Sequence, residues 1–170
     1  MINTERLILR PHTLADFEDL CAMWGDPAVM KHFGGVGSTR EECWARLMRY
    51  VGHWQIKGFG FWVVADKDTG AYLGELGLMD FMRTLDAEHR SFGEAPEMGW
   101  SFTVAAHGKG YATEAGAAAL AWADAHFGRT RIVCMISPSN EPSKRVASRL
   151  GFQEYARAVY KGDVLLYERP

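Results

Sequence analysis

The chain has 170 residues, of which 48% are hydrophobic and 24% charged, a composition typical of one folded domain with one substantial core. Its formal net charge of −2, without a long block of like charge, argues against nucleic acid as a partner, because duplex-binding proteins need basic residues to neutralise phosphates. The apolar runs are too short to span a membrane and the N-terminus lacks a signal peptide's apolar region, so we expect one cytoplasmic domain, residues 1–170, with no membrane partner.

The N-terminal part of the chain predicts one strand followed by two helices. Residues 6–10 alternate in hydrophobicity and are expected to form the strand. Thr13 can cap a first helix that ends before Pro27, and residues 38–57 contain capping-box spacing and a second helix. The positions expected to be buried are Leu14, Phe17, Leu20, Cys21 and Trp24 in the first helix and Trp44, Leu47, Val51 and Trp54 in the second.

Three strands are predicted in the middle of the chain, over residues 59–65, 72–79 and 96–104. The first two are separated by a short polar turn and are expected to form a hairpin. In the third strand the apolar residues Met98, Trp100, Phe102 and Val104 alternate with Glu97, Gly99, Ser101 and Thr103. One face of this strand is therefore apolar, and the other is small and polar.

The C-terminal part predicts an alanine-rich helix over 109–127, a strand over 131–136, a helix to Leu150 capped by Ser139 or Asn140, and a final hairpin. The predicted order is βααβββαβαββ. Because a long helix joins the strands at 96–104 and 131–136, we expect these two to be parallel neighbours with a right-handed crossover. The other strands are joined by short turns, so the fold class is α/β with a mixed, mostly antiparallel sheet.

The three cysteines and six histidines form no metal-binding pattern. Cys21, Cys43 and Cys134 are far apart and fit neither a disulfide framework nor a CxxC site. The histidines include no HExxH or HxH spacing. We therefore expect buried, unpaired cysteines and no metal.

Gly108 and Gly110 lie where the strand at 96–104 passes into the long helix. Glycines there let the backbone present consecutive N–H groups which, together with the helix N-terminus, can bind a phosphate. A dinucleotide-binding fingerprint would need Gly or Ala where Thr113 stands, and no run fits a P-loop. On its own, the short Gly-x-Gly turn is also compatible with an ordinary loop.

Several motifs in the correct order resemble the GNAT superfamily of N-acetyltransferases, in particular the branch of ribosomal-protein N-terminal alanine and serine acetyltransferases. The run Gly-Lys-Gly-Tyr-Ala-Thr-Glu-Ala that begins at Gly108 is similar to that branch's cofactor loop. The opening run Thr-Glu-Arg-Leu-Ile-Leu-Arg-Pro that begins at Thr4 is similar to its first strand. The second signature, Asn-x-x-Ser followed by Gly-Phe, is matched by Asn140, Ser143, Gly151 and Phe152. The resemblance covers nearly the whole chain.

The resemblance implies acetyl-CoA as co-substrate and assigns residues that would bind it. Phe102, Thr103 and Val104 occupy the strand that would bond the pantetheine arm through its backbone. The residues whose N–H groups would hold the pyrophosphate are Gly108, Lys109, Gly110, Tyr111, Ala112 and Thr113. Asn140 would reach the pantetheine or cap its helix. His107 stands where the family usually has Arg or Gln, which puts a side-chain contact to phosphate in doubt.

The resemblance also implies direct acetyl transfer, which needs a base and a donor for the leaving thiolate. Glu97 is the candidate base and Glu75 the reserve candidate, whereas Glu114 fits a structural role better. Many family members protonate the thiolate with a Tyr at the position of Ala147, so Ser143 is the substitute donor here.

Two functions remain open from the sequence. The first is an N-acetyltransferase acting on a primary amine, either a protein N-terminus or a small molecule, and the second is a non-catalytic acetyl-CoA-binding sensor or interaction module. In the family the acceptor groove is built from the two early helices and the final hairpin. Large aromatic residues in those parts are usually core, so no substrate contact is assigned to Phe33, Trp54, Phe61, Trp62 or Phe81. Both a monomer and a homodimer are compatible with the sequence.

Overall fold

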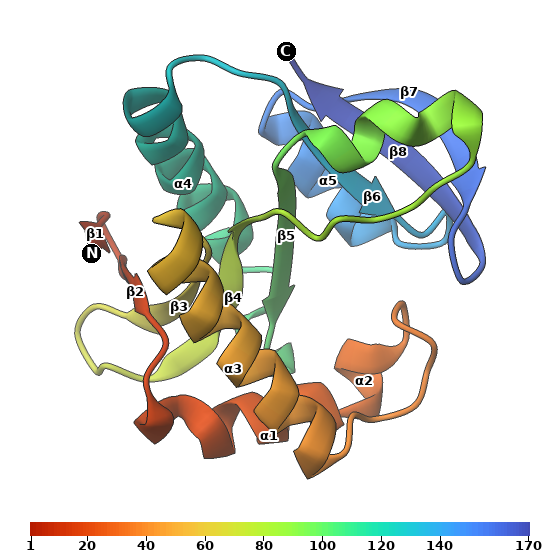
Figure 1. Cartoon of the computed structure of the whole chain (residues 1–170). Coiled ribbons are helices and arrows are strands. Elements are labelled where there is room, and N and C mark those ends of the chain that lie inside the picture. Colours follow the sequence, from red (N-terminus) through yellow and green to blue (C-terminus); the bar gives the residue numbers. More distant parts are fainter.

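The computed structural model describes the backbone of residues 1–170 and all side chains except those of Ala87 and Arg90. An eight-stranded sheet crosses the molecule in the order β1-β2-β3-β4-β5-β6-β8-β7 (Figure 1). The strands are β1 (Ile2–Asn3), β2 (Leu7–Pro11), β3 (Phe61–Asp66), β4 (Tyr72–Met79), β5 (Glu97–Phe102), β6 (Ile132–Ile136), β7 (Gln153–Val159) and β8 (Asp163–Arg169). Neighbouring strands are antiparallel except β5 and β6, which confirms the predicted mixed sheet with one parallel pair.

The helices cover both faces of this sheet. The α-helices are α1 (Phe17–Gly25), α2 (Pro27–Met30), α3 (Arg40–Lys57), α4 (Tyr111–Phe127) and α5 (Glu141–Arg149), and the 3₁₀ segments are η1 (Leu14–Asp16), η2 (Ala87–Glu94) and η3 (Val104–Ala106). Side chains of α1, α2 and α3 form one core cluster with β3 and β4, and those of α4 and α5 form another with the opposite face. Figure 1 shows β1–β4 with α1 and α3 on the left, β6–β8 with α5 on the right, and β5 between them.

Small residues allow α4 to lie close to the sheet and to α5. Ala115, Ala119 and Ala123, spaced by four residues, are buried on one side of α4. A Cβ added at Gly116 would lie 2.5 Å from Cδ1 of Leu150, so this position has room only for a hydrogen. Because these residues are small, α4 packs close to the sheet, with its N-terminus beside the end of β5.

The buried side of α3 differs from the predicted one. Trp44 and Val51 are each 43% exposed, whereas Cys43, Leu47 and Tyr50 are buried. Tyr50 is inside because its hydroxyl donates to the buried carboxylate of Glu75, a long-range contact that the helical pattern cannot reveal. The expected burial of Leu14 is also wrong, since it lies on a 3₁₀ turn and is 68% exposed.

The parallel strands β5 and β6 meet at one end and then separate. Glu97 is opposite Val133, whose N–H donates to the carbonyl of Pro96 at 3.1 Å. Within the described backbone this is the only ladder position between the two strands, whereas β4 pairs with β5 along the whole of β5. The edge of β5 that faces β6 therefore leaves backbone groups available to another hydrogen-bonding partner.

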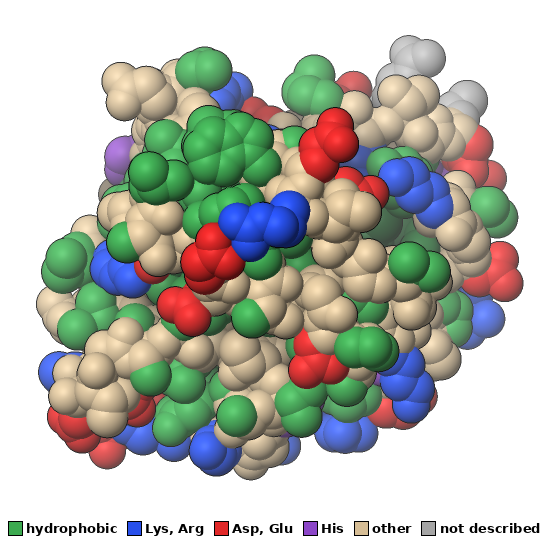
Figure 2. All heavy atoms as spheres, turned by 90° about the horizontal axis from the view of Figure 1, so that it is seen from below, with side chains coloured by type: hydrophobic (Ala, Val, Ile, Leu, Met, Phe, Trp, Pro, Cys, Tyr) green, Lys and Arg blue, Asp and Glu red, His purple; other side chains and the backbone are tan. Residues whose placement is uncertain are grey.

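The outer surface of the described chain carries mixed charge. On the face shown in Figure 2, acidic and basic side chains are interspersed with apolar ones. In the described part of the chain, we find no helix with the length and apolar character that crossing a membrane requires.

Candidate active site

The loop between β5 and α4 forms an open backbone cradle. Gly108 and Gly110 have φ values of 74° and 82°, in the left-handed region that glycine adopts without strain. Gly110 is the N-cap of α4, so the first N–H groups of that helix lack partners within the helix and point out of its end. A Cβ at Gly108 would meet no atom within 4 Å, which shows that the cradle is not filled by protein. Such an arrangement suits a phosphate group.

A contact that was not predicted from the sequence ties this loop to the N-terminal strand. Nε of Arg6 donates to the carboxylate of Glu114 at 2.7 Å, and Nη1 of Arg6 donates to the carbonyl of Lys109 at 3.0 Å. Thr4 also donates to Glu114, at 2.6 Å, and the Arg6 guanidinium lies 4.7 Å from the centre of the Tyr111 ring. Glu114 therefore orders the loop, in agreement with the structural role favoured for it, and the opening motif around Arg6 was the available signal.

His107 turns toward β5 and away from the helix N-terminus. Its Nε2 lies 3.0 Å from the carbonyl of Phe102, so this nitrogen is the donor. The side chain thereby fixes the bend between the strand and the loop. A phosphate contact from His107 stays an untested prediction.

The residues predicted to flank the pantetheine arm lie where β5 leaves the sheet. Phe102 is buried in the core, and the N–H of Thr103 donates to the carbonyl of Leu73 near the start of β4. Val104 is 45% exposed. A groove of about 380 Å³ opens here between α1 and the end of β5, and its lining residues are Asp19, Ala22, Met23, Asp26, Tyr72, Thr103, Val104 and Ala105.

Asn140 and Ser143 stand at the start of α5, across the opening from β5. The side-chain oxygen of Asn140 accepts from the N–H of Ser143 at 3.1 Å, which is the capping role. The hydroxyl oxygen of Ser143 accepts from the indole N–H of Trp100 at 3.2 Å. This bond is one bridge between β5 and the C-terminal half, and it leaves the Ser143 hydroxyl proton free for another acceptor.

Glu97 lies at the end of β5 that stays paired with β6. Its carboxylate is nearly buried and accepts from Nε and Nη2 of Arg83, at 2.5 and 2.9 Å. Burial raises the pKa of Glu97 above its ordinary value, and the opposing effect of Arg83 does not cancel the increase. The side chain is thus a carboxylate that takes up a proton more readily than an exposed glutamate would.

Glu75 is fully buried and has several polar partners. It accepts from the Tyr50 hydroxyl, from the Trp24 indole N–H at 3.1 Å and from the Tyr72 hydroxyl at 3.3 Å, and Nε2 of His12 lies 3.5 Å away. Burial alone would raise the pKa of Glu75, but the neighbouring His12, the charge of Arg46 and the hydrogen bond from Tyr50 lower it below its ordinary value.

The predicted polar face of β5 confronts α1 and α3. Ser101 is opposite Glu75 across the β4–β5 ladder, and Glu97 is four residues along the same strand, roughly 13 Å away at about 3.4 Å per residue. Glu75 therefore lies beside the Ser101 end of β5, and Glu97 lies at the other end of that strand. The bond from Trp100 to Ser143 brings the start of α5 to the open edge of β5, the glycine loop follows the end of that strand, and Glu97 lies where β5 still pairs with β6.

Comparison with known proteins shows the family of this chain. Residues 6–153 match the family described as "Acetyltransferase (GNAT) domain". This chain belongs to the GNAT acetyltransferases. A solved Bordetella pertussis protein assigned to the GnaT-family acetyltransferases is 35% identical, with a TM-score of 0.87 over 99% of this chain and 98% of that one.

Two further relatives agree with this GNAT assignment. An uncharacterised N-acetyltransferase of Bacillus licheniformis, p20, is 28% identical over 89% of this chain and 81% of its own length. A spermidine N-acetyltransferase from Vibrio cholerae shares the fold, with a TM-score of 0.74 at 17% identity over 98% of this chain and 96% of that one. The present GNAT chain is therefore an N-acetyltransferase with the mixed sheet of that family.

Proposed function

We propose that this N-acetyltransferase transfers the acetyl group of acetyl-CoA directly to a primary amine within a ternary complex, and that residues 1–170 act as one catalytic domain. The observation that carries the proposal is the open edge of β5 leading into the glycine cradle at the N-terminus of α4. The open edge of β5 up to Phe102 would bond the pantetheine arm as an added strand does, while Thr103 and Val104 lie beyond the strand and their carbonyls already accept from N–H groups of the following turn. The N–H groups of residues 108–112 would hold the pyrophosphate, whereas that of Thr113 already donates to the carbonyl of Gly110.

Glu97 is supported as the general base in preference to Glu75. The raised pKa of Glu97 favours proton uptake, whereas the pKa of Glu75 is lowered and its oxygens already accept from several donors. An acceptor enters as an ammonium ion and leaves as an amide, so its nitrogen loses two protons. One proton goes to Glu97 and then to solvent. The other ends on the sulfur when the carbon–sulfur bond breaks.

Ser143 is the proposed donor to that sulfur. Because Trp100 already donates to its oxygen, the hydroxyl hydrogen is directed elsewhere, and Ser143 can pass its proton to the thiolate and recover the proton of the new amide nitrogen. Ala147, at the position of the family's usual Tyr, is fully buried and supplies no donor.

The two buried cysteines, Cys43 and Cys134, support direct transfer without an acetyl-enzyme. Burial raises the pKa of Cys43 to about 11, and it raises the pKa of Cys134 well above that of a free thiol. Because the thiolate is the nucleophilic form, neither side chain is suited to take the acetyl group at neutral pH.

The test is release of free CoA thiol from acetyl-CoA in the presence of a panel of amines. The panel includes spermine, because the Vibrio cholerae relative was solved in complex with CoA and spermine, and peptides with free N-termini. We expect amine-dependent thiol release together with saturable acetyl-CoA binding by calorimetry. Tight acetyl-CoA binding without thiol release from any amine would contradict catalysis and favour a sensor.

A further inference from the structure

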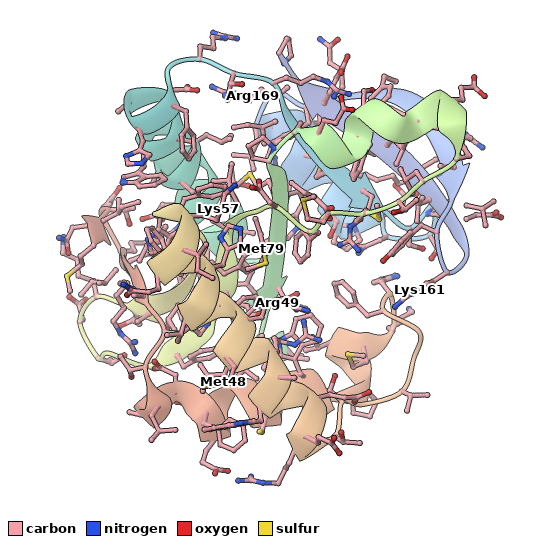
Figure 3. All side chains as sticks on the ribbon, viewed as in Figure 1. Met48, Arg49, Lys57, Met79, Lys161 and Arg169 are labelled. Atoms are coloured by element: carbon pink, nitrogen blue, oxygen red, sulfur yellow. The ribbon has the colours of Figure 1, made fainter. Side chains whose placement is uncertain are left out.

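Three basic side chains from separate parts of the chain lie near the ion pair of Arg83 with Glu97 at the start of β5. Arg49 comes from α3, Arg83 from the connection between β4 and β5, and Lys161 from the turn between β7 and β8. We call these three residues the basic cluster. In Figure 3 the labelled Arg49 and Lys161 come from elements on either side of β5.

Two aromatic rings join the members of the basic cluster. The guanidinium carbons of Arg83 and Arg49 lie 4.4 and 5.8 Å from the centre of the Phe81 ring. Arg83 also lies 4.8 Å from the centre of the Tyr160 ring, and Nζ of Lys161 lies 5.9 Å from the same point. Arg83 therefore shares one ring with Arg49 and the other with Lys161, so the three cations lie around the same two rings.

The protein supplies too few negative charges for this cluster. Among the described side chains, the one ion pair within 4.0 Å that involves it is Arg83 with Glu97. Arg49 and Lys161 have no carboxylate at that distance, whereas other basic residues, such as Arg10 and Arg169, are paired with aspartates. The region next to Glu97 therefore carries an excess of positive charge.

The acidic residues of the groove beside α1 do not compensate for this excess. Asp19 and Asp26 line that groove together with Thr103. Thr103 is six residues beyond Glu97, roughly 20 Å along the strand at about 3.4 Å per residue. At such a separation salt screens exposed charges from one another, because the Debye length is about 8 Å at physiological ionic strength.

We propose that the acceptor is a small primary amine that also carries a carboxylate, and that this carboxylate binds the basic cluster. The inference rests on the proposed acetyl transfer and names its substrate class. Guanidinium groups bind carboxylates in a paired geometry, and Arg83 already holds Glu97 in this way. An acceptor carboxylate would compete with the Glu97 carboxylate for the N–H groups of Arg83. Arg49 and Lys161 would bind the same acceptor carboxylate. The competition frees the Glu97 oxygens to take the proton of the amine that has just been bound.

The experiment compares acceptors that differ only in the carboxylate. Rates of CoA thiol release are measured with a set of amino acids, with their carboxamides and with spermine. A carboxamide has the less basic amine, so more of it is neutral, and without carboxylate recognition it would be the faster acceptor. We expect kcat/KM to be at least tenfold higher for the amino acid than for its carboxamide.

Variants show whether the basic cluster causes the preference. Arg49→Ala and Lys161→Ala change exposed side chains, and each is expected to lower the ratio of acid to carboxamide, with the double variant bringing it close to one. Arg40→Ala is the matched control, because Arg40 is an exposed residue of α3 that pairs with Glu18, and it should leave the ratio unchanged. Thermal unfolding of each variant is measured to confirm that it is folded.

Three results would overturn the inference. Faster reaction of carboxamides or spermine would remove the carboxylate requirement while leaving the proposed acetyl transfer intact. A preference for the acid that survives in the double variant would place carboxylate recognition elsewhere. Binding of acetyl-CoA without thiol release from any amine would overturn the proposed acetyl transfer, and this inference with it.

Discussion

Replacing the buried Glu75 with glutamine tests whether its charge stabilises the fold. The carboxylate accepts from Tyr50, Trp24 and Tyr72. A glutamine has one acceptor oxygen and one NH₂ group, so the NH₂ would face hydroxyl or indole donors. Loss of two hydrogen bonds to a charged acceptor costs about 3 to 6 kcal/mol. This agrees with about 3 to 5 kcal/mol for removing one partner of a buried ion pair.

The pH dependence follows from the lowered pKa of Glu75. A carboxyl group with a lowered pKa in the folded state stabilises the fold fully above its unfolded pKa, which is about 4.3. The stabilisation is lost as the pH falls through the folded pKa. The wild type should therefore lose this contribution in acid, and the glutamine variant has none to lose.

The assay is thermal unfolding of wild type and Glu75→Gln between pH 3 and pH 8. At neutral pH we expect the melting temperature of the variant to be lower by roughly 6 to 24 °C, from about 2 to 4 °C per kcal/mol for a chain of this size. The difference should shrink toward pH 3. Glu18→Gln, which alters an exposed carboxylate, should show no such difference. A neutral-pH loss below about 1 kcal/mol, or a difference independent of pH, would refute the reasoning.

Three other predictions concern the site. Glu97→Gln should lower kcat/KM by about 10²- to 10⁴-fold and remove the increase of rate with pH through the raised pKa of Glu97, and an unchanged pH profile would exclude this base. Ser143→Ala should lower kcat with little change in the acetyl-CoA dissociation constant, measured by stopped-flow and calorimetry; equal losses in both would indicate cofactor binding instead. Gly110→Ala, at φ 82°, should weaken acetyl-CoA binding measured by calorimetry, whereas Gly128→Ala, at the far end of α4, should not.

Much of this fold was predictable from interactions between residues that are close in the sequence. Asn140, one of the two expected caps, caps α5, and β5 and β6 are parallel as expected. These features depend on residues close in sequence or on the handedness of a crossover. The buried face of α3 was predicted only in part, because Trp44–Leu47–Val51 and Cys43–Leu47–Tyr50 both have helical spacing, and only a partner on β4 decides which series is buried.

The site was predictable only in part, for a related physical reason. The backbone cradle follows from the order of glycines, so its position was predictable. The bonds from Arg83 to Glu97 and from Arg6 to Glu114 join residues 14 and 108 positions apart, and sequence spacing does not predict pairs at such separations. The basic cluster is assembled from three distant elements, so it becomes visible only after the chain has folded.

Because β5 and β6 pair at a single ladder position, the sheet consists of two parts, β1–β5 and β6–β8, and the gap between β5 and β6 forms a seam. A ligand lying along that seam would supply the hydrogen bonds that the strands do not make to each other, so its binding energy adds to the resistance of the fold to opening. At a concentration 100 times its dissociation constant, acetyl-CoA would raise the unfolding free energy by about 2.7 kcal/mol. Amide hydrogen exchange along the open edge of β5 should then slow more than exchange in β3, which is paired on both sides. Bound acetyl-CoA would thus stabilise the sheet at the place where β5 and β6 do not pair with each other.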